Sequence, residues 1–305
     1  MRILNFGSLN IDKVYNVKDF VRPGETVLAL EYQEFPGGKG LNQSVALAKA
    51  GAETYHAGII GCDGAGLKAA LDAAGVHTEL LKELPEPSGH AIIEINEEGQ
   101  NRIIVNSGTN ARIDEDYILQ VLALFCRDDI LLIQNEISGM ASIMEHACEK
   151  GMKIILNPSP VNEALFTYPL DKVDIFVLNE TEGLALAGMQ TGTPEDILRR
   201  LREKYQNAEF VLTLGEQGAC YLGKDTCPDI CYQSAFITKT VDTTAAGDTF
   251  CGYFIRAYAE GKTPGEALYM AAKASALAVS RHGASPSIPL AEEVRALTNF
   301  AEAFQ

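Results

Sequence analysis

The amino-acid sequence predicts an α/β protein built on a mostly parallel β-sheet. Apolar strand-like runs alternate along the chain with segments of helical periodicity, which is the order expected of βαβ units. The chain has 305 residues, of which 47% are hydrophobic, so it can bury a full core. This length fits either one large α/β domain with an appendage or two modest domains.

The main sheet is predicted from six apolar runs, at residues 3–9, 54–60, 130–134, 153–156, 175–178 and 210–214. Helical periodicity falls between them at residues 41–50, 67–74, 116–125, 138–150 and 194–205. The last third is predicted to be helical over about residues 248–281 and again over 290–300.

Two regions break the alternation. Residues 27–34, and residues 91–96 followed by 102–106, have strand patterns with no helix between them. They predict a small sheet that stands off the main one, able to cover a site or to pair with a second copy.

Composition excludes several classes of function. The net charge of -16 argues against binding to nucleic acid or to an anionic membrane, so a bound phosphate must be held by local donors and metal. The seven Cys form no CxxC pair and the five His are far apart, which indicates reduced thiols and no zinc site. No apolar run has the length of a signal peptide or a membrane span, so we expect a soluble, cytoplasmic protein.

The most informative motif runs over residues 242–250. Phe250, Phe254 and Tyr258 recur at helical spacing, so a helix begins near Gly247 and directs its free amides outward. Small residues there let a phosphate approach, and Asp248 lies where a base is useful. The structural alternative is that Asp242 or Thr243 caps a turn and Asp248 is an acidic residue in the first helical turn.

Residues 36–40 precede another predicted helix with three glycines around Lys39. They place an ammonium at a helix N-terminus, although the spacing is not that of a Walker A loop. A plain glycine-rich turn is the alternative. Residues 64–69 fit a loose dinucleotide pattern, which is weak evidence for a dehydrogenase.

Other polar residues follow predicted strands at the edge where ligands of parallel sheets collect. Asn179 and Glu182 have the spacing of a capping box, or could bind magnesium waters. Glu136 ends one strand, and Asn10 and Asp12 end the first. Residues 214–218 predict a strand-turn-strand hairpin, and residues 283–287 a helix stop.

With residues 7–12, 37–43, 179–182 and 242–250 in this order, nearly the whole chain resembles the ribokinase family of sugar kinases, of the phosphofructokinase-B type. The resemblance implies one doubly wound α/β domain over residues 1–305. It also implies a small β lid, contributed by about residues 12–35 and 90–107, through which two subunits form a homodimer. The implied reaction is ATP-dependent transfer of the γ-phosphate to the primary hydroxyl of a furanose, D-ribose first. The alternatives are another furanose of the fructose type, a nucleoside, or a sugar-binding regulator without turnover.

The resemblance also assigns roles to residues. Asp248 is implied to be the general base, and the implied anion hole consists of Ala245, Ala246 and Gly247. The implied sugar-binding residues are Asn10, Asp12, Gly38, Lys39, Asn42, Glu136 and Asp248. Those implied for ATP and Mg²⁺ are Asn179, Glu182, Thr213, Gly215, Gly218 and Gly247. Those implied for a monovalent cation, usually K⁺, are Asp242, Thr244, Ala278, Arg281, Gly283 and Ser287.

Overall fold

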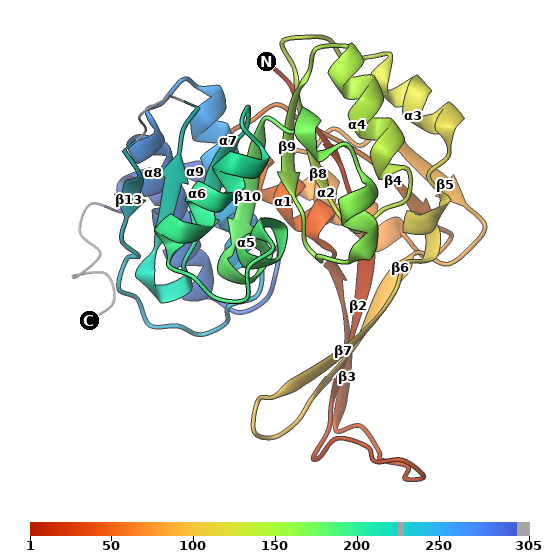
Figure 1. Ribbon diagram of the computed structural model, residues 1–305. Helices are drawn as coiled ribbons and strands as arrows, with labels where there is room; N and C mark the ends of the chain where they lie inside the picture. Colours follow the sequence, from red (N-terminus) through yellow and green to blue (C-terminus); the bar gives the residue numbers. More distant parts are fainter. Residues whose placement is uncertain (225–228, 298–305) are drawn as a thin grey trace.

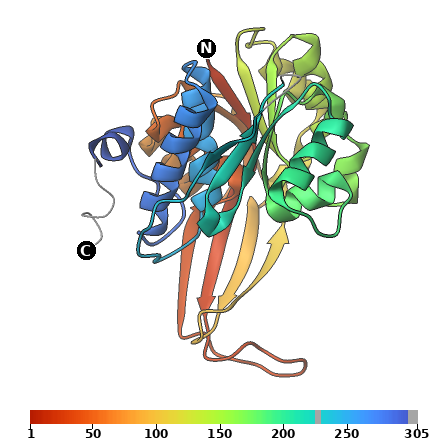
Figure 2. The ribbon, with the colours of Figure 1, turned by 60° about the vertical axis from the view of Figure 1, so that its left-hand side comes forward.

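The computed structural model describes residues 1–224 and 229–297. Within these ranges a nine-stranded sheet forms the centre of the molecule, with helices on both of its faces (Figures 1 and 2). Its strands are β1 (Ile3–Phe6), β4 (Thr54–Gly61), β5 (Leu81–Leu84), β8 (Ile130–Gln134), β9 (Lys153–Asn157), β10 (Ile175–Asn179), β11 (Glu209–Thr213), β12 (Ala219–Leu222) and β13 (Cys231–Gln233).

The spatial order of this sheet is β13-β12-β11-β10-β9-β8-β1-β4-β5. Neighbouring strands from β11 to β5 are parallel, whereas β12 and β13 are antiparallel additions at one edge. The mostly parallel sheet predicted from the sequence is therefore confirmed. The order runs outward in both directions from β1, which places the carboxyl ends of β1 and β8 next to each other.

Alternate residues of the central strands supply two separate cores. In β8, Leu131 and Ile133 pack with helices α3 (Glu115–Leu122), α4 (Met140–Glu149), α5 (Glu180–Ala187) and α6 (Pro194–Lys204). Ile130 and Leu132 face the other side, with α1 (Lys39–Lys49), α7 (Ala246–Ala259), α8 (Pro264–Val279) and α9 (Ala291–Ala296). Helix α2 (Ala65–Ala73) packs beside α1 in a smaller cluster. Because these strands are buried on both faces, they are mainly apolar, and polar residues such as Asn5 in β1 and Gln134 in β8 are the exceptions.

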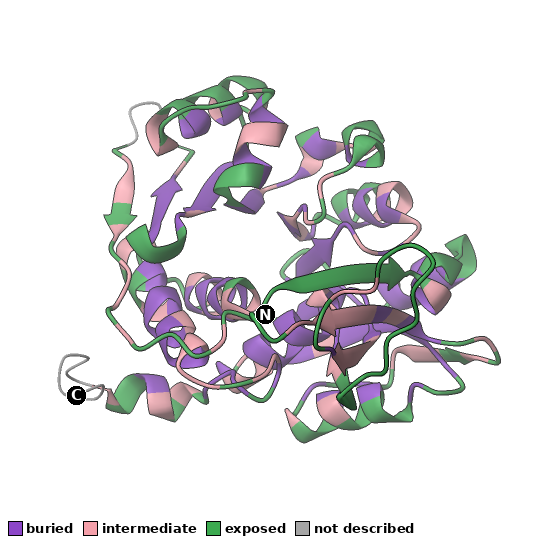
Figure 3. Cartoon of the chain, turned by 90° about the horizontal axis from the view of Figure 1, so that it is seen from below, coloured by how far each residue is buried: buried purple, intermediate pink, exposed green. Residues whose placement is uncertain are grey.

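A four-stranded sheet projects from the edge where the parallel strands end (Figure 1). Its order is β3 (Glu31–Gly37), β2 (Asn10–Asn16), β6 (Gly89–Ile95) and β7 (Asn101–Asn106). Figure 3 shows its strands mainly as exposed or intermediate, in contrast to the buried central sheet. We call this sheet the lid. The second, smaller sheet predicted from two excursions is thus present.

Several predicted boundaries were wrong. The first strand ends at Phe6, because Ser8 accepts a hydrogen bond from the amide of Leu41 and Leu9 donates to Asn110 instead of pairing with a strand. Asn10 and Asp12 therefore do not end that strand but belong to β2 of the lid. The residue pattern did not predict this strand, although the lid implied by the resemblance, over about residues 12–35, includes most of it.

The apolar run at residues 27–34 is a strand only from Glu31 onward. Its partner β2 ends at Asn16, which pairs with Glu31, so the preceding residues have no ladder partner. Leu28 is left 90% exposed.

The helix predicted over residues 248–281 is two helices. Gly261 turns the chain with φ of 76°, and Thr263 then starts α8 with a capping box to Glu266. The helix predicted at 290–300 is observed as α9, and its last three predicted residues lie outside the described residues. Among the described residues, no helix is both long enough and apolar enough to cross a membrane.

Candidate active site

The N-terminus of α7 forms one wall of the candidate active site. Its N-cap residue Ala245 has φ of 58°, the one positive φ at a non-glycine residue in the part of the chain that the structure describes. The left-handed region costs such a residue about 1–2 kcal/mol. The amide and the hydroxyl of Thr249 both donate to the Ala245 carbonyl at 2.8 Å and hold it there. Ala246 and Gly247 line the adjacent pocket, and because the Ala246 amide donates to the Thr243 carbonyl at 3.2 Å, the Gly247 amide is the first of α7 that can serve a ligand there.

Asp248 follows directly in α7 and is held by two amide side chains of α1. Gln43 Nε2 donates to one carboxylate oxygen at 2.9 Å, and Asn42 Nδ2 donates to the other at 3.2 Å. Burial raises the pKa of Asp248, and the Lys39 charge and these two hydrogen bonds only partly offset that rise. A carboxylate with a raised pKa and a fixed orientation is well suited to accept a proton.

Lys39 and Glu136 meet on the other side of Asp248. Lys39 is the first residue of α1, and its amide donates to Glu136 Oε2 at 3.1 Å, where the Ser8 hydroxyl also donates at 2.5 Å. Burial alone would lower the pKa of Lys39, but the charges of Asp248, Glu136 and Glu182 outweigh it and raise that pKa. Burial raises the pKa of Glu136, against the opposing effect of Lys39.

Glycines allow this close approach of chain segments. Gly38 caps α1 with φ of 92°, and a Cβ on Gly40 would lie 2.3 Å from the Ser8 amide nitrogen. The prediction that Lys39 lies at a helix N-terminus is confirmed.

Asp12 and Asn10 reach the same region from β2 of the lid. Asn10 Oδ1 accepts a hydrogen bond from Asn110 Nδ2 at 2.8 Å. Burial raises the pKa of Asp12 to about 6, and the charge of Glu136 adds to this effect. The structure thus brings Asp12 close to Glu136, and Glu136 and Asp248 close to the Lys39 ammonium. Such a set of acceptors and one donor matches a polyhydroxylated ligand.

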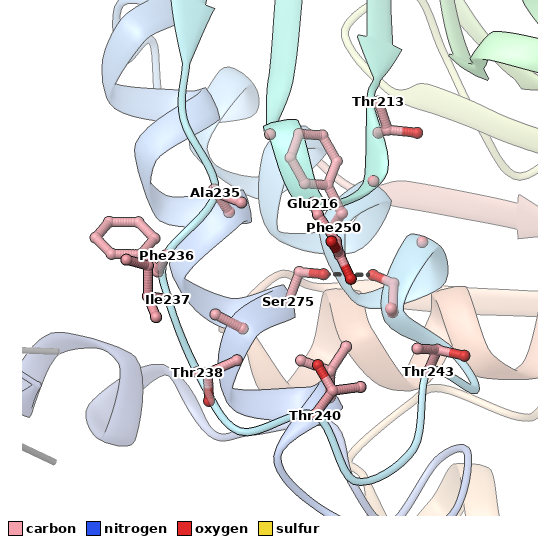
Figure 4. Close-up of a pocket in the computed structure, with 17 residues that line it drawn as sticks. Thr213, Glu216, Ala235, Phe236, Ile237, Thr238, Thr240, Thr243, Phe250 and Ser275 are labelled. Atoms are coloured by element: carbon pink, nitrogen blue, oxygen red, sulfur yellow. Dashed lines mark hydrogen bonds between the residues drawn. The ribbon is translucent and has the colours of Figure 1, made fainter. Parts of the chain in front are cut away.

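A pocket of about 590 Å³ opens beside the start of α7 (Figure 4). Thr213, Gly215 and Gly218 line it from β11 and the turn that follows. The opposite wall comes from residues 235–240 and from α8, where Ser275 Oγ donates to the Ala246 carbonyl at 3.1 Å. The buried hydroxyl oxygen of Thr238 has no hydrogen-bond partner. The pocket has the size of a small-molecule site. Gly247, which lines the pocket, directly precedes Asp248 in α7.

Asn179 and Glu182 form a complete capping box at the start of α5. Asn179 Oδ1 accepts from the Glu182 amide at 2.9 Å, and Glu182 Oε2 accepts from the Asn179 amide at 3.0 Å. The capping prediction is confirmed. The carboxylate retains further lone pairs beyond these contacts.

The residues expected around a monovalent cation come from two segments that are joined by Asp242. Its Oδ2 accepts from the Gly283 amide at 2.9 Å, and its Oδ1 accepts from the Thr244 amide and hydroxyl. Burial alone would raise the pKa of Asp242, but these hydrogen bonds lower it, so the carboxylate is charged. Its oxygens, with hydroxyls and backbone carbonyls nearby, are a donor set suited to a hard cation. The side chain of Arg281 points away to Glu293, 2.6 Å distant, so only its carbonyl remains for this role. Among the described residues no group of three or more His, Cys, Asp or Glu could hold a metal.

Some functional residues were not predicted. Gln43 stood within the quoted motif but received no role, although it touches the proposed base directly. Ser8 and Asn110 were also missed. Ser8 donates a hydrogen bond to Glu136, and Asn110 donates one to Asn10. Residues 235–240 of the pocket carry no motif that sequence reasoning recognises.

A doubly wound fold with a lid, a buried carboxyl group and a helix N-terminus beside a pocket is the arrangement expected of a small-molecule kinase. The model of the pfkB family of carbohydrate kinases matches residues 2–291. The ribokinase of Haemophilus influenzae is 34% identical over 294 residues, which cover 94% of this chain and 95% of the relative.

Two solved structures are also similar. The ribokinase of Thermotoga maritima superposes with a TM-score of 0.85 at 35% identity, covering 99% of both chains. The Arabidopsis thaliana ribokinase complexed with ribose and ATP has a TM-score of 0.85 at 32% identity, covering 97% of this chain and 98% of that one. The chain therefore belongs to the pfkB family of carbohydrate kinases and is an ATP-dependent sugar kinase.

Proposed function

We propose that this enzyme transfers the γ-phosphoryl group of ATP to the primary hydroxyl of D-ribose, giving ribose 5-phosphate. One observation carries the proposal: Asp248 touches the sugar-side helix α1 through Asn42 and Gln43, and the preceding Gly247 lines the nucleotide-sized pocket. A base in this position reaches an acceptor hydroxyl on one side and a phosphoryl donor on the other. The similarity to ribokinases, one of them crystallised with ribose and ATP, supports the choice of substrates.

The mechanism assigns a distinct role to each group. Asn10, Asp12, Gly38, Lys39, Asn42 and Glu136 hold the sugar hydroxyls. The base Asp248 takes the proton of the primary hydroxyl as its oxygen attacks the γ-phosphorus. The amides at Ala245, Ala246 and Gly247 would donate to the phosphoryl oxygens and stabilise the charge that develops on them, the Ala246 amide in exchange for the Thr243 carbonyl that it now contacts. Adenosine and the remaining phosphates occupy the pocket lined by Thr213, Gly215 and Gly218.

Two metal ions belong to the proposal. Mg²⁺ would be held near Asn179 and Glu182 through water and would neutralise phosphate charge. K⁺ would be held by Asp242, Thr244, Ala278, Arg281, Gly283 and Ser287, several of them through backbone carbonyls. It would fix the loop that leads into the anion hole, because Asp242 lies only three residues before Ala245.

We also propose a homodimer formed through the lid. Ile103, Ile104 and Val105 of the edge strand β7 are 55%, 68% and 62% exposed, and Leu28 and Leu30 are exposed at the lid's tip. An exposed apolar edge strand favours pairing with another chain.

A cytoplasmic location fits the requirement for ATP and the free cysteines among the described residues.

A sugar panel with ATP, Mg²⁺ and K⁺ tests the substrate. D-ribose is expected to give the highest kcat/KM, with fructose and nucleosides far lower. A strong preference for another furanose or for a nucleoside would refute ribose as the substrate. Tight ribose binding without ADP formation would instead support a sugar-binding regulator.

A further inference from the structure

Lys49, the last residue of α1, makes contacts that the proposed reaction does not use. Its ammonium donates to the backbone carbonyl of Ile288 at 2.8 Å and to that of Ser285 at 3.2 Å. Burial lowers the pKa of this half-buried lysine, with Arg281 acting in the same direction and Glu293 opposing it. A lysine ammonium that is partly removed from water is stabilised by the acceptors of its hydrogen bonds, here these two carbonyl groups.

The two acceptors lie in the loop that follows α8. Ser287, a proposed cation ligand, falls between Ser285 and Ile288, and it is 1% exposed. The Ser287 hydroxyl donates to the Ala284 carbonyl at 2.8 Å, and Ile288 is buried beside Leu41 and Val45 of α1. The ammonium of Lys49 therefore fixes the backbone on both sides of Ser287.

Other contacts fasten the same loop at its start. The Gly283 amide donates to Asp242, and the Arg281 side chain pairs with Glu293. These contacts hold residues 281–283, whereas Lys49 alone among the charged side chains of α1 holds residues 285–288. Removing the ammonium would leave two buried or half-buried carbonyls without their donor.

We propose that Lys49 is a positioning residue for the monovalent-cation site, because it sets the backbone around Ser287 from the far end of α1. This inference rests on the proposed K⁺ site. It also gives α1 a second role, since its first turns hold Asp248 through Asn42 and Gln43 while its last residue shapes the cation loop.

The test is a K⁺ titration of turnover at saturating ribose and Mg-ATP, with a parallel K⁺ titration of the melting temperature of the enzyme without substrates, in which Lys49→Met should need correspondingly more K⁺ for the same stabilisation. Lys49→Met removes both hydrogen bonds and should raise the K⁺ concentration for half-maximal activity by about tenfold or more. Lys49→Gln keeps one neutral donor group, so its half-activating K⁺ concentration should fall between those of Lys49→Met and the unmodified enzyme. Lys49→Arg should restore most of the K⁺ affinity. At saturating K⁺, kcat should return close to that of the unmodified enzyme. Lys68→Met is the matched control, because Lys68 is exposed on α2, where its ammonium pairs with Asp72.

Several results would overturn the inference. A half-activating K⁺ concentration that is unchanged or lowered in Lys49→Met, even with reduced kcat or melting temperature, would show a general structural role or simple charge repulsion. If Lys49→Met does not fold, Lys49→Gln decides in the same way. An unmodified enzyme that ignores K⁺ would refute the cation site and this inference together. If K⁺ activates the unmodified enzyme but the Lys49 variants have the same half-activating K⁺ concentration, only the role of Lys49 would be refuted.

Discussion

Gln43 Nε2 donates to Asp248 Oδ1 at 2.9 Å, while Gln43 Oε1 accepts from Gln134 Nε2 at 2.7 Å. The second contact fixes which end of the Gln43 amide faces the base. Gln134 in turn donates to Asn5, so the orientation of Asp248 is set by a chain of buried amides that reaches β1. The base is therefore positioned by the centre of the sheet as well as by its own helix.

Replacing Gln43 by Met should lower kcat by about tenfold, because Asp248 loses one of its two donors and its orientation. The pKa of Asp248 should also rise, since the hydrogen bond from Gln43 lowers it. A pH profile of kcat would show this as an acid limb displaced to higher pH. Gln120→Met, at an exposed position on α3, is the control. A lower kcat with an unmoved acid limb would contradict the positioning role.

Asp248→Asn should lower kcat by about 10²–10⁴-fold, the usual contribution of a positioned general base. Ribose and ATP should still bind, because the other proposed sugar-binding residues and the pocket are untouched. Single-turnover kinetics with calorimetric binding would separate the two effects. Near-normal turnover would show that another group accepts the proton.

Ribose affinity should fall as the pH drops through about 6, the pKa of Asp12. Below this value the carboxyl is protonated, and it loses acceptor capacity for a sugar hydroxyl. Asp12→Asn should bind ribose about tenfold more weakly at pH 7.5 and should flatten this pH dependence. Calorimetric dissociation constants between pH 5 and pH 8 would check it. An identical acid limb in the variant would assign the titration to another carboxyl group.

Gly252→Ala should destabilise the fold by about 1–3 kcal/mol, because the added Cβ would lie 2.5 Å from that of Ala46 where α7 crosses α1. Gly66→Ala on α2 is the matched control, since nothing lies within 4 Å of its added Cβ. That variant should be neutral or stabilised by up to about 1 kcal/mol. Denaturant unfolding of both variants would measure the difference. Equal stability of the two would mean that α7 can shift away from α1.

Ile104→Lys should convert the proposed dimer to a monomer, because it places a charge in the exposed apolar strand β7. Sedimentation velocity at micromolar concentration would measure the change. Leu119→Lys, at an equally apolar but lid-distant position on α3, should leave the dimer intact. A monomeric unmodified protein, or a dimer that survives Ile104→Lys, would contradict assembly through the lid.

Features determined by neighbouring residues were predictable from the sequence. The capping box of Asn179 and Glu182 spans four residues, and the α7 terminus follows from the spacing of Phe250 and Phe254. The six predicted strands of the main sheet were equally clear, because burial on both faces makes them nearly continuous apolar runs, whereas the edge strands β5 and β13 were not predicted.

Features that depend on distant partners were not predictable. Gln43 and Asp248 are 205 residues apart, and no local pattern says that they touch. The strand β2 was missed because its side chains after Asn10 are only half-buried and mix polar with apolar residues. Its partner β3 was displaced in the prediction because the apolar residues before Glu31 are exposed, against the usual meaning of such a run.

Strand β2 runs from the proposed sugar site to the outer end of the lid. Asn10 and Asp12 lie at its start, and its later residues pair with β3 and β6 far from the reacting groups. All seven residues of β2 are paired with β3 on one side and β6 on the other. A substitution that shifts the strand at its outer end can therefore also shift Asn10 and Asp12. Under the proposed assembly through the lid, substitutions in β2 would therefore change dimerisation and ribose affinity together.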